Sequence, residues 1–367
     1  MARAARTNLT PTPRTALAAA ACACLLAAGA HAVAAAGARG TPPPQGPPVA
    51  ADDTARGVAQ YKGGDADAAI KSLRAATKKN KGDEAAWYYL GLSLLKKGKS
   101  KDARAALETA LALRPTSVAA RNGLAYALLY LGKTFEALRL SEETLKLDPQ
   151  NAESHYVRGL AQYRLNYYSK ALEESEAALK IAPSFESALL LKAQALVAMS
   201  SNALTTAGDE TPDVRDLLRG KIAERLDEAT GALDKFSKLS PREVKIIEPV
   251  REEIMTLRVY GAVPGTQSPD GPIYSSKEVT TKALISDRPE PIYTERAKEN
   301  QVTGTVRVRM VLAADGNVKH VVAVSRLPDG LTEAAVRAAR RLKFVPATKD
   351  GRPVSQYVTI DYNFNIY

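Results

Sequence analysis

Hydrophobic and polar residues alternate with a period of two in three stretches near the C-terminus. The first stretch, residues 302–313, directs Val306 and Val308 to one face, which predicts a half-buried β-strand. Asp315-Gly316 then predicts a tight turn, and residues 318–324 resume the alternation, so the two stretches predict an antiparallel hairpin. The residues expected on one face of the second strand are Val318, His320, Val322 and Val324.

The same region contains two short amphipathic runs, residues 291–300 and 331–342, with the spacing of helices. The third alternating stretch, residues 354–366, follows the second run and predicts a last strand. Residues 287–367 are therefore predicted to form a small αβ domain, in which two helices accompany a three-stranded antiparallel sheet.

A strand at the edge of a sheet exposes unpaired backbone N–H and C=O groups, which can pair with an extended peptide. We therefore expect the last strand to bind a partner by strand addition. The residues expected to form this edge are Gln356, Tyr357, Val358, Thr359, Ile360, Asp361, Tyr362 and Asn363. In the alternative interpretation, Phe364 and Ile366 only complete a small core and the edge is shielded.

The C-terminal region resembles the C-terminal domain of TonB-family proteins over residues 287–367. The landmarks that carry the resemblance are Tyr293, Ala297, Gly304, Asp315-Gly316, Phe344-Val345-Pro346 and Gly351-Arg352-Pro353. The resemblance implies that helices cover one face of a three-stranded sheet. It also implies that the last strand binds a TonB-dependent outer-membrane transporter, with energy relayed from a proton-driven motor in the inner membrane.

A fixed 34-residue spacing organises residues 51–260. The recurring positions are Gly64, Gly98 and Gly132, then Ala69, Ala103, Ala137 and Ala171, and finally Pro115, Pro149 and Pro183. This period is typical of stacked helix-turn-helix units of the tetratricopeptide (TPR) type, in which small residues let paired helices approach and a proline ends each unit. The predicted fold of the chain is therefore a helical TPR solenoid followed by the small αβ domain.

Departures from the repeat carry their own predictions. Asn166 stands where other units have glycine, so we expect the fourth turn to be less tight. A polar segment, Ser200 to Asp213, interrupts the fifth unit, whose second helix is expected to restart at Thr211-Pro212. The segment Ser240 to Glu243 predicts a capping box for a closing helix, which Pro249 is expected to kink or split.

In TPR proteins the first helix of each pair lines a concave groove, so the resemblance to these repeats implies a peptide-binding groove. The residues that it places there are Tyr88, Lys96, Tyr126, Tyr130, Tyr156, Tyr163 and Arg164. Aromatic rings with a polar end, beside cations, suit an extended peptide with an acidic side chain or a terminal carboxylate. In the alternative interpretation, several of these tyrosines only pack between neighbouring helices.

The first 34 residues have the pattern of a secretory signal, because arginines precede an apolar run, Ala16 to Ala30, and small residues follow it. The protein is therefore expected in the periplasm. In the competing interpretation, a longer apolar run stays uncleaved and anchors the protein in the inner membrane. Residues 35–50 predict a proline-rich spacer and residues 261–286 a linker, of which Val279 to Ile285 is apolar enough for an extra strand.

Composition argues against several other functions. The formal net charge of +11 is spread along the chain without the basic stripe that a phosphate backbone requires, so no nucleic-acid partner is expected. Both cysteines, Cys22 and Cys24, lie in the leader, and only His155 and His320 follow it, so neither a metal site nor a cofactor is expected. With no phosphate loop, no nucleophile elbow and dispersed carboxylates, we do not expect an enzyme.

Three functions remain as hypotheses. In the first, which the family resemblance favours, the protein is a TonB-like transducer whose repeats recruit other envelope proteins. In the second, it is a soluble periplasmic adaptor that keeps the capture domain without motor coupling. In the third, it is a repeat scaffold whose terminal domain forms a homodimer through its edge strands.

Overall fold

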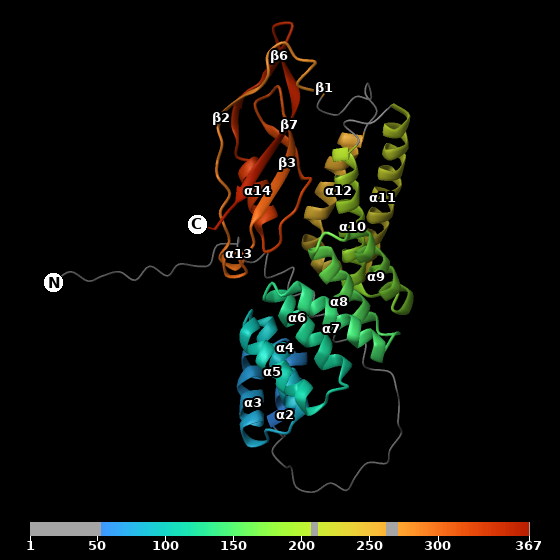
Figure 1. Cartoon of the computed structure of the whole chain (residues 1–367), viewed down its shortest axis with the longest axis vertical. Helices are drawn as coiled ribbons and strands as arrows, with labels where there is room; N and C mark the ends of the chain where they lie inside the picture. Colours follow the sequence, from blue (N-terminus) through green and yellow to red (C-terminus); the bar gives the residue numbers. More distant parts are fainter. Residues whose placement is uncertain (1–52, 207–211, 262–270, 367) are drawn as a thin grey trace, which may run out of the picture.

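The computed structural model describes residues 53–206, 212–261 and 271–366. The predicted leader, the spacer and the predicted N-cap Thr211 lie outside these ranges. An array of helix pairs is followed by a domain of strands and short helices, which lies beside the last helices of the array (Figure 1). This arrangement confirms the predicted fold class.

The array is built from successive helix pairs. The first four pairs are α2 (Asp53–Lys62) with α3 (Ala66–Lys79), α4 (Glu84–Lys96) with α5 (Ser100–Leu113), α6 (Val118–Tyr130) with α7 (Thr134–Leu147), and α8 (Ala152–Arg164) with α9 (Tyr168–Ile181). A longer fifth pair follows, α10 (Glu186–Thr206) and α11 (Pro212–Leu239), and then the 3-10 helix η3 (Pro241–Ile246) and the closing helix α12 (Glu248–Gly261). None of the helices in the described ranges is long and apolar enough to cross a membrane.

The turns within the pairs use a left-handed residue. Gly98 and Gly132 adopt φ values of 70° and 72°, a conformation that glycine reaches without a Cβ clash. Asn166 adopts nearly the same value, 62°, and asparagine is among the few other residues that tolerate it. The amide of Asn166 donates to the Tyr163 carbonyl at 3.0 Å, as that of Gly98 does to the Leu95 carbonyl at 2.9 Å. The expected loosening of the fourth turn is therefore wrong.

Close packing between paired helices depends on a glycine opposite a leucine. Leu107 is fully buried, and a Cβ added to Gly91 would overlap its side chain. Gly123 from the next pair approaches the same leucine, since a Cβ there would lie 2.9 Å from Leu107 Cδ2. One leucine thus fills the space that glycines leave in two neighbouring repeats, as expected for interiors packed to crystal-like density.

The end of the array differs from one expectation. Pro249 lies in the first turn of α12, directly after the 3-10 helix, so the predicted split at this proline is confirmed. The Ser240 side chain makes no capping hydrogen bond, so the predicted capping box is wrong. A 3-10 turn begins there instead, because Pro241 at its first position needs no N–H partner.

The C-terminal domain contains one main sheet with the strand order β1-β7-β3-β4, in which β6 also pairs with β7. Its strands are β1 (Ile273–Tyr274), β3 (Gly304–Leu312), β4 (Val318–Ala323), β6 (Ala347–Lys349) and β7 (Arg352–Phe364). A second, small sheet pairs β2 (Leu284–Asp287) with β5 (Lys343–Val345), and the helices are α13 (Glu295–Glu299) and α14 (Leu331–Ala339). The predicted antiparallel strands are β3, β4 and β7, but the predicted count of three strands is wrong, because β1 and β6 also join the sheet.

Part of the predicted linker belongs to this domain. Residues 271–287 contain β1, which pairs in parallel with β7, and β2, which pairs with β5. Thr281 also pairs with Thr348 of β6. The expected extra strand within Val279 to Ile285 therefore forms in part, as β2, and the domain begins earlier in the chain than residue 287.

Strand β4 contains a β-bulge that the alternating pattern did not reveal. Val311 pairs with Lys319 and Arg309 with Val322, so His320 and Val321 together oppose a single residue, and His320 takes φ = 50°. After the bulge, Val321 belongs to the core of the domain, whereas Val322 and Val324 are buried against the closing helices of the array. The expectation that Val318, His320, Val322 and Val324 share one face is wrong, because a bulge reverses the alternation.

Candidate functional site

The backbone of β7 is free along one edge for part of its length. On one side, β3 pairs with β7 from Gln356 to Phe364. On the other side, β1 pairs only with Ser355 and Gln356. Beyond Gln356, the far edge therefore has no strand partner in the described parts of the chain.

The hydrogen-bond pattern of β3 shows which residues of β7 present their backbone to this edge. Arg307, which pairs with Asp361, directs its carbonyl to the Val324 amide at 2.9 Å and its amide to Ser325 Oγ at 2.7 Å, both on the β4 side. Asp361 consequently turns its N–H and C=O away from β3. By alternation, Thr359 and Asn363 also present N–H and C=O groups to the free edge.

The side chains along this strand fix its register. Ile360, Tyr362 and Phe364 are buried in the domain core, and Val358 packs against it. On the other face, the Arg307 guanidinium donates to both oxygens of Asp361, at 2.7 and 2.9 Å, and these hydrogen bonds lower the pKa of that carboxyl. A bidentate pair of this kind adds geometric specificity to β3–β7 pairing.

Three of the predicted edge residues, Gln356, Asp361 and Tyr362, have further contacts within the chain. Gln356 lies between Leu312 of β3 and Tyr274 of β1, and its side chain accepts a hydrogen bond from the Ala283 amide at 2.8 Å. The structure thus removes Gln356 from the predicted open edge. Arg288 donates to the carbonyl of Asp361 and lies over the Tyr362 ring at 5.0 Å, so its side chain covers part of the edge without adding a strand.

The outward face of the same sheet contacts the array. Tyr357 packs against Tyr260 of α12, with ring centroids 5.4 Å apart, and the Arg309 guanidinium lies 5.1 and 5.4 Å from the two rings. Tyr260 also donates a hydrogen bond to the carbonyl of His320 at the bulge. Tyr357, predicted as a partner-binding residue, is therefore half-buried at an interdomain contact.

Two ion pairs strengthen this interdomain contact. Arg326 pairs with Glu253 of α12, and each side chain is only 19% exposed. Burial opposes the charge of Arg326, yet Glu253 and the neighbouring tyrosines raise its pKa. Arg340 pairs with Glu252 at 3.1 Å, and there each side chain is 53% exposed. The closing helix thus supports the sheet that carries the candidate edge.

The predicted groove residues fall into three different environments. Tyr126 and Tyr156 are 4% and 1% exposed with ring centroids 6.4 Å apart, so for them the packing alternative applies. Tyr163 packs against Tyr168 at 5.3 Å, close to the interdomain pair, and burial raises its pKa to about 12. Arg164 donates to the carbonyl of Leu129 in the preceding repeat.

Sequence reasoning missed a carboxylate in the middle of these tyrosines. Glu153 of α8 is half-buried and forms a hydrogen bond with the Asn122 side chain, and burial raises the pKa of Glu153 to about 7. Burial and the charge of Glu153 also raise the pKa of Tyr88 and of Tyr126. Comparison of the repeats could have indicated Glu153 as unusual, because two earlier units have alanine at the equivalent position, Ala85 and Ala119. An acidic ligand is therefore disfavoured in this part of the groove.

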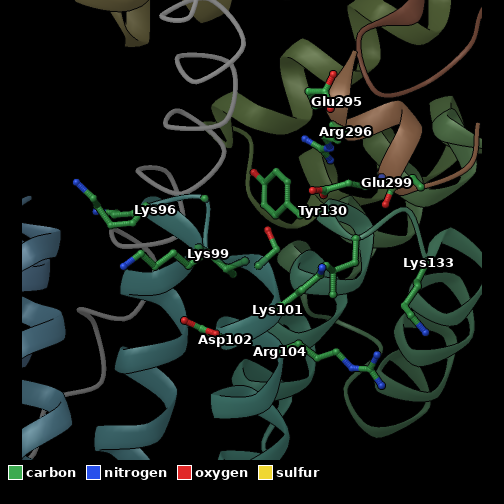
Figure 2. A pocket seen from close by; sticks show the side chains of 16 residues that line it. Lys96, Lys99, Lys101, Asp102, Arg104, Tyr130, Lys133, Glu295, Arg296 and Glu299 are labelled. Carbon is green, nitrogen blue, oxygen red and sulfur yellow. The ribbon is translucent and has the colours of Figure 1, made fainter. Parts of the chain in front are cut away.

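The other two groove residues, Lys96 and Tyr130, line a cleft between the array and the C-terminal domain (Figure 2). One wall consists of the α4–α5 turn, residues 95–104, and the end of α6, and the other consists of α13. The cleft has a volume of about 1270 Å³. The Arg296 guanidinium of α13 lies 5.3 Å from the Tyr130 ring, which joins the two walls.

Comparisons with known proteins agree with this architecture. A family model described as Gram-negative bacterial TonB protein C-terminal matches residues 289–366. A tetratricopeptide repeat model matches residues 54–118, 90–138 and 122–184. The chain therefore contains tetratricopeptide repeats and a C-terminal domain of the TonB type, and the predicted resemblance is confirmed.

One curated relative is Protein TonB of Vibrio cholerae serotype O1, which is 29% identical over 108 residues. The match covers 27% of this chain and 44% of that protein, so less than half of the relative is represented. Among solved structures, a thermophilic TPR protein of Thermus thermophilus is 23% identical to this chain, with a TM-score of 0.44. The match covers 55% of this chain and 97% of that protein. A second solved structure, MamA, is 21% identical to this chain, with a TM-score of 0.37. That match covers 52% of this chain and 96% of MamA.

Proposed function

We propose that this protein is a TonB-like cell-envelope protein that binds an extended segment of an outer-membrane transporter. The segment adds as a strand to the free edge of β7, and the binding contributes to energy-coupled transport across the outer membrane. The TPR array acts as a protein-binding module that recruits further envelope proteins. The proposed activity is binding without catalysis, and no group of three His, Cys, Asp or Glu residues in the described ranges is arranged to hold a metal ion.

One observation carries this proposal: Thr359 and Asn363 direct their backbone polar groups away from β3, past the point where β1 ends. The N–H of Asp361 points the same way, whereas its carbonyl accepts a hydrogen bond from Arg288. Exposed groups of this kind are satisfied by water or by an added strand. The core side chains and the Arg307–Asp361 pair hold β7 straight against β3. An incoming segment therefore meets an ordered template and orders mainly itself.

A proline substitution tests strand addition without unfolding the domain. Thr359→Pro removes an N–H that faces outward, so the ladder with β3 keeps its hydrogen bonds, and proline is tolerated on edge strands. Thr359→Ala is the matched control, because it removes the exposed side chain and keeps the N–H. Photocrosslinking from position 359 in envelope preparations, followed by mass spectrometry, identifies the partner segment.

A synthetic peptide of that segment then gives the affinity by calorimetry. We expect Thr359→Ala to bind like the unmodified protein. Thr359→Pro should bind roughly tenfold more weakly, since one backbone hydrogen bond contributes about 1 kcal/mol and the ring also obstructs the approaching strand. Equal binding by the two variants would show that the segment does not pair with this edge.

The soluble adaptor is the second candidate. In that proposal β7 still captures the envelope partner, but no membrane segment joins the protein to a motor. Mass spectrometry of the N-terminus of the protein from the cell envelope separates the two: a cleaved leader favours the adaptor, and an intact one favours the transducer.

A further inference from the structure

We propose that the cleft between the TPR array and the C-terminal domain binds an acidic stretch of a protein partner. This inference deepens the proposed role of the array as a protein-binding module and does not depend on strand addition at β7. The array contributes Lys96, Lys99 and Lys101 from the α4–α5 turn, and the C-terminal domain contributes α13 as the facing wall.

The C-terminal wall of the cleft is held in place by a buried carboxylate. The Asp329 side chain is 1% exposed and accepts a hydrogen bond from Asn300 Nδ2 at 2.6 Å. It also pairs with Arg296 at 3.1 Å, and Arg296 in turn covers the Tyr130 ring. A Cβ on Gly132 of the array would lie 2.6 Å from Asn300 Cγ, so the two domains touch directly at the base of the cleft.

The cations that line the cleft divide into two groups. Four of them are neutralised by carboxylates outside it: Lys97 by Asp67 at 2.8 Å, Arg104 by Glu108 at 2.7 Å, Lys133 by Glu136 at 2.6 Å, and Arg296 by Asp329 at 3.1 Å. Lys96, Lys99 and Lys101 have no carboxylate partner in the ranges that the structure describes. The lining carboxylates Asp102 and Glu295 lie near Arg74 and Lys298, at 3.9 and 2.9 Å. Among the described residues, the cleft lining therefore holds three lysines without a carboxylate partner and one carboxylate without a cationic partner, that of Glu299.

Two further features favour an anionic partner at the lysine wall. The Lys96 ammonium lies 4.2 Å from the centre of the Tyr61 ring, and burial lowers its pKa, so an anionic partner would replace solvation that this group has lost. Helix α5 begins beside it, and Lys99 at its N-cap makes no side-chain hydrogen bond to the first N–H groups of the helix. The positive end of the helix dipole adds to the lysine charges.

The arrangement suits several carboxylates in a row better than a single phosphate. Lys96 and Lys99 lie to one side of Tyr130 in Figure 2, and α13 lies to the other, so the charges are spread along the cleft. The arginines that would clamp a phosphate, Arg104 and Arg296, already bind carboxylates. A nucleic acid would need a longer run of free cations than three lysines. An extended acidic peptide, with Tyr130 beside its backbone, fits this distribution of charge.

Binding of a fluorescein-labelled hexaglutamate peptide to the full chain, followed by anisotropy at two salt concentrations, tests this inference. We expect the triple variant Lys96→Gln, Lys99→Gln, Lys101→Gln to bind roughly tenfold more weakly than the unmodified protein, because three charge contacts are lost. The control variant Lys146→Gln, Lys180→Gln, Lys238→Gln removes the same charge from exposed positions outside the cleft. It should bind within twofold of the unmodified protein.

The outcomes separate this site from the edge of β7. Thr359→Pro should bind hexaglutamate normally, so a failure of strand addition leaves the cleft result intact. Equal losses in the two triple variants would overturn the inference, because they would indicate non-specific attraction to net charge. Equally tight binding of a labelled hexathymidylate that depends on the same lysines would assign the cleft to phosphates instead. Circular dichroism checks that each variant is folded.

Discussion

The ion pair between Arg326 and Glu253 is expected to hold the C-terminal domain against the array. Both side chains are mostly shielded from water, and the carboxylate of Glu253 also accepts a hydrogen bond from Ser201 at 3.3 Å. Arg326→Ala would leave Glu253 charged beside Tyr163 and Tyr168 with its main counter-ion gone.

The expected magnitude follows from the burial of this pair. Removing one partner of a buried ion pair costs about 3–5 kcal/mol, and the remaining exposure reduces this to about 2–3 kcal/mol here. The docking equilibrium should then shift by roughly 30- to 150-fold. Arg340→Ala at the same interface is the matched control: its pair with Glu252 is half-exposed, and such pairs contribute about 0.2–1 kcal/mol.

Energy transfer between fluorophores on the two domains measures docking directly. Labels on cysteines that replace the exposed residues Lys238 and Arg352, with Cys22 and Cys24 changed to serine, report the distance between α11 and the start of β7. Titration with urea should separate the domains of Arg326→Ala at a lower concentration than those of Arg340→Ala. Identical midpoints for the two variants would refute the assigned role of burial at this pair.

Two predictions concern the array itself. Because burial raises the pKa of Glu153 to about 7 from an unfolded value near 4.5, the folded state binds more protons between these values, and stability should fall as pH rises from 5 to 8. Urea unfolding should show a loss of about 1–2 kcal/mol over this range that Glu153→Gln abolishes, and an unchanged pH dependence in the variant would contradict the assignment. In the same assay, Leu107→Ala should lower the free energy of unfolding by about 3–4 kcal/mol, because the cavity that it leaves between two glycines cannot close. The control Leu113→Ala, at an exposed position, should lower it by less than about 1 kcal/mol. Similar losses in the two variants would contradict this packing.

The periodic parts of the structure could be predicted from the sequence. The recurrence of Gly98, Ala103 and Pro115 at fixed distances determines a helix pair, its turn and its end, all from contacts within one repeat. The alternation in β3 likewise predicted its buried face correctly, with Val306, Val308 and Met310 fully buried. Both patterns are local, and a local pattern of apolar residues predicts which face of a helix or strand packs against the core.

The candidate edge could be predicted in part. The sequence indicated that β7 is long and amphipathic, but the pairing of β1 with Gln356 required knowledge that a glycine- and proline-rich segment returns to the sheet. Residues 273–274 lie far along the chain from residues 355–356, and nothing in the two short segments marks them as partners. The length of free edge was therefore decided by a long-range contact.

The interdomain features depended on the tertiary structure alone. The bulge at His320 reverses the faces of β4 and turns Val322 toward the array, and the cleft exists only because α13 comes to lie opposite the α4–α5 turn. Glu153 acquires its raised pKa from burial beside helices of other repeats. The sequence by itself determined which elements form and which face of each is apolar, because those follow from neighbours along the chain. The tertiary structure decided which surfaces remain open, because that depends on where the second domain docks.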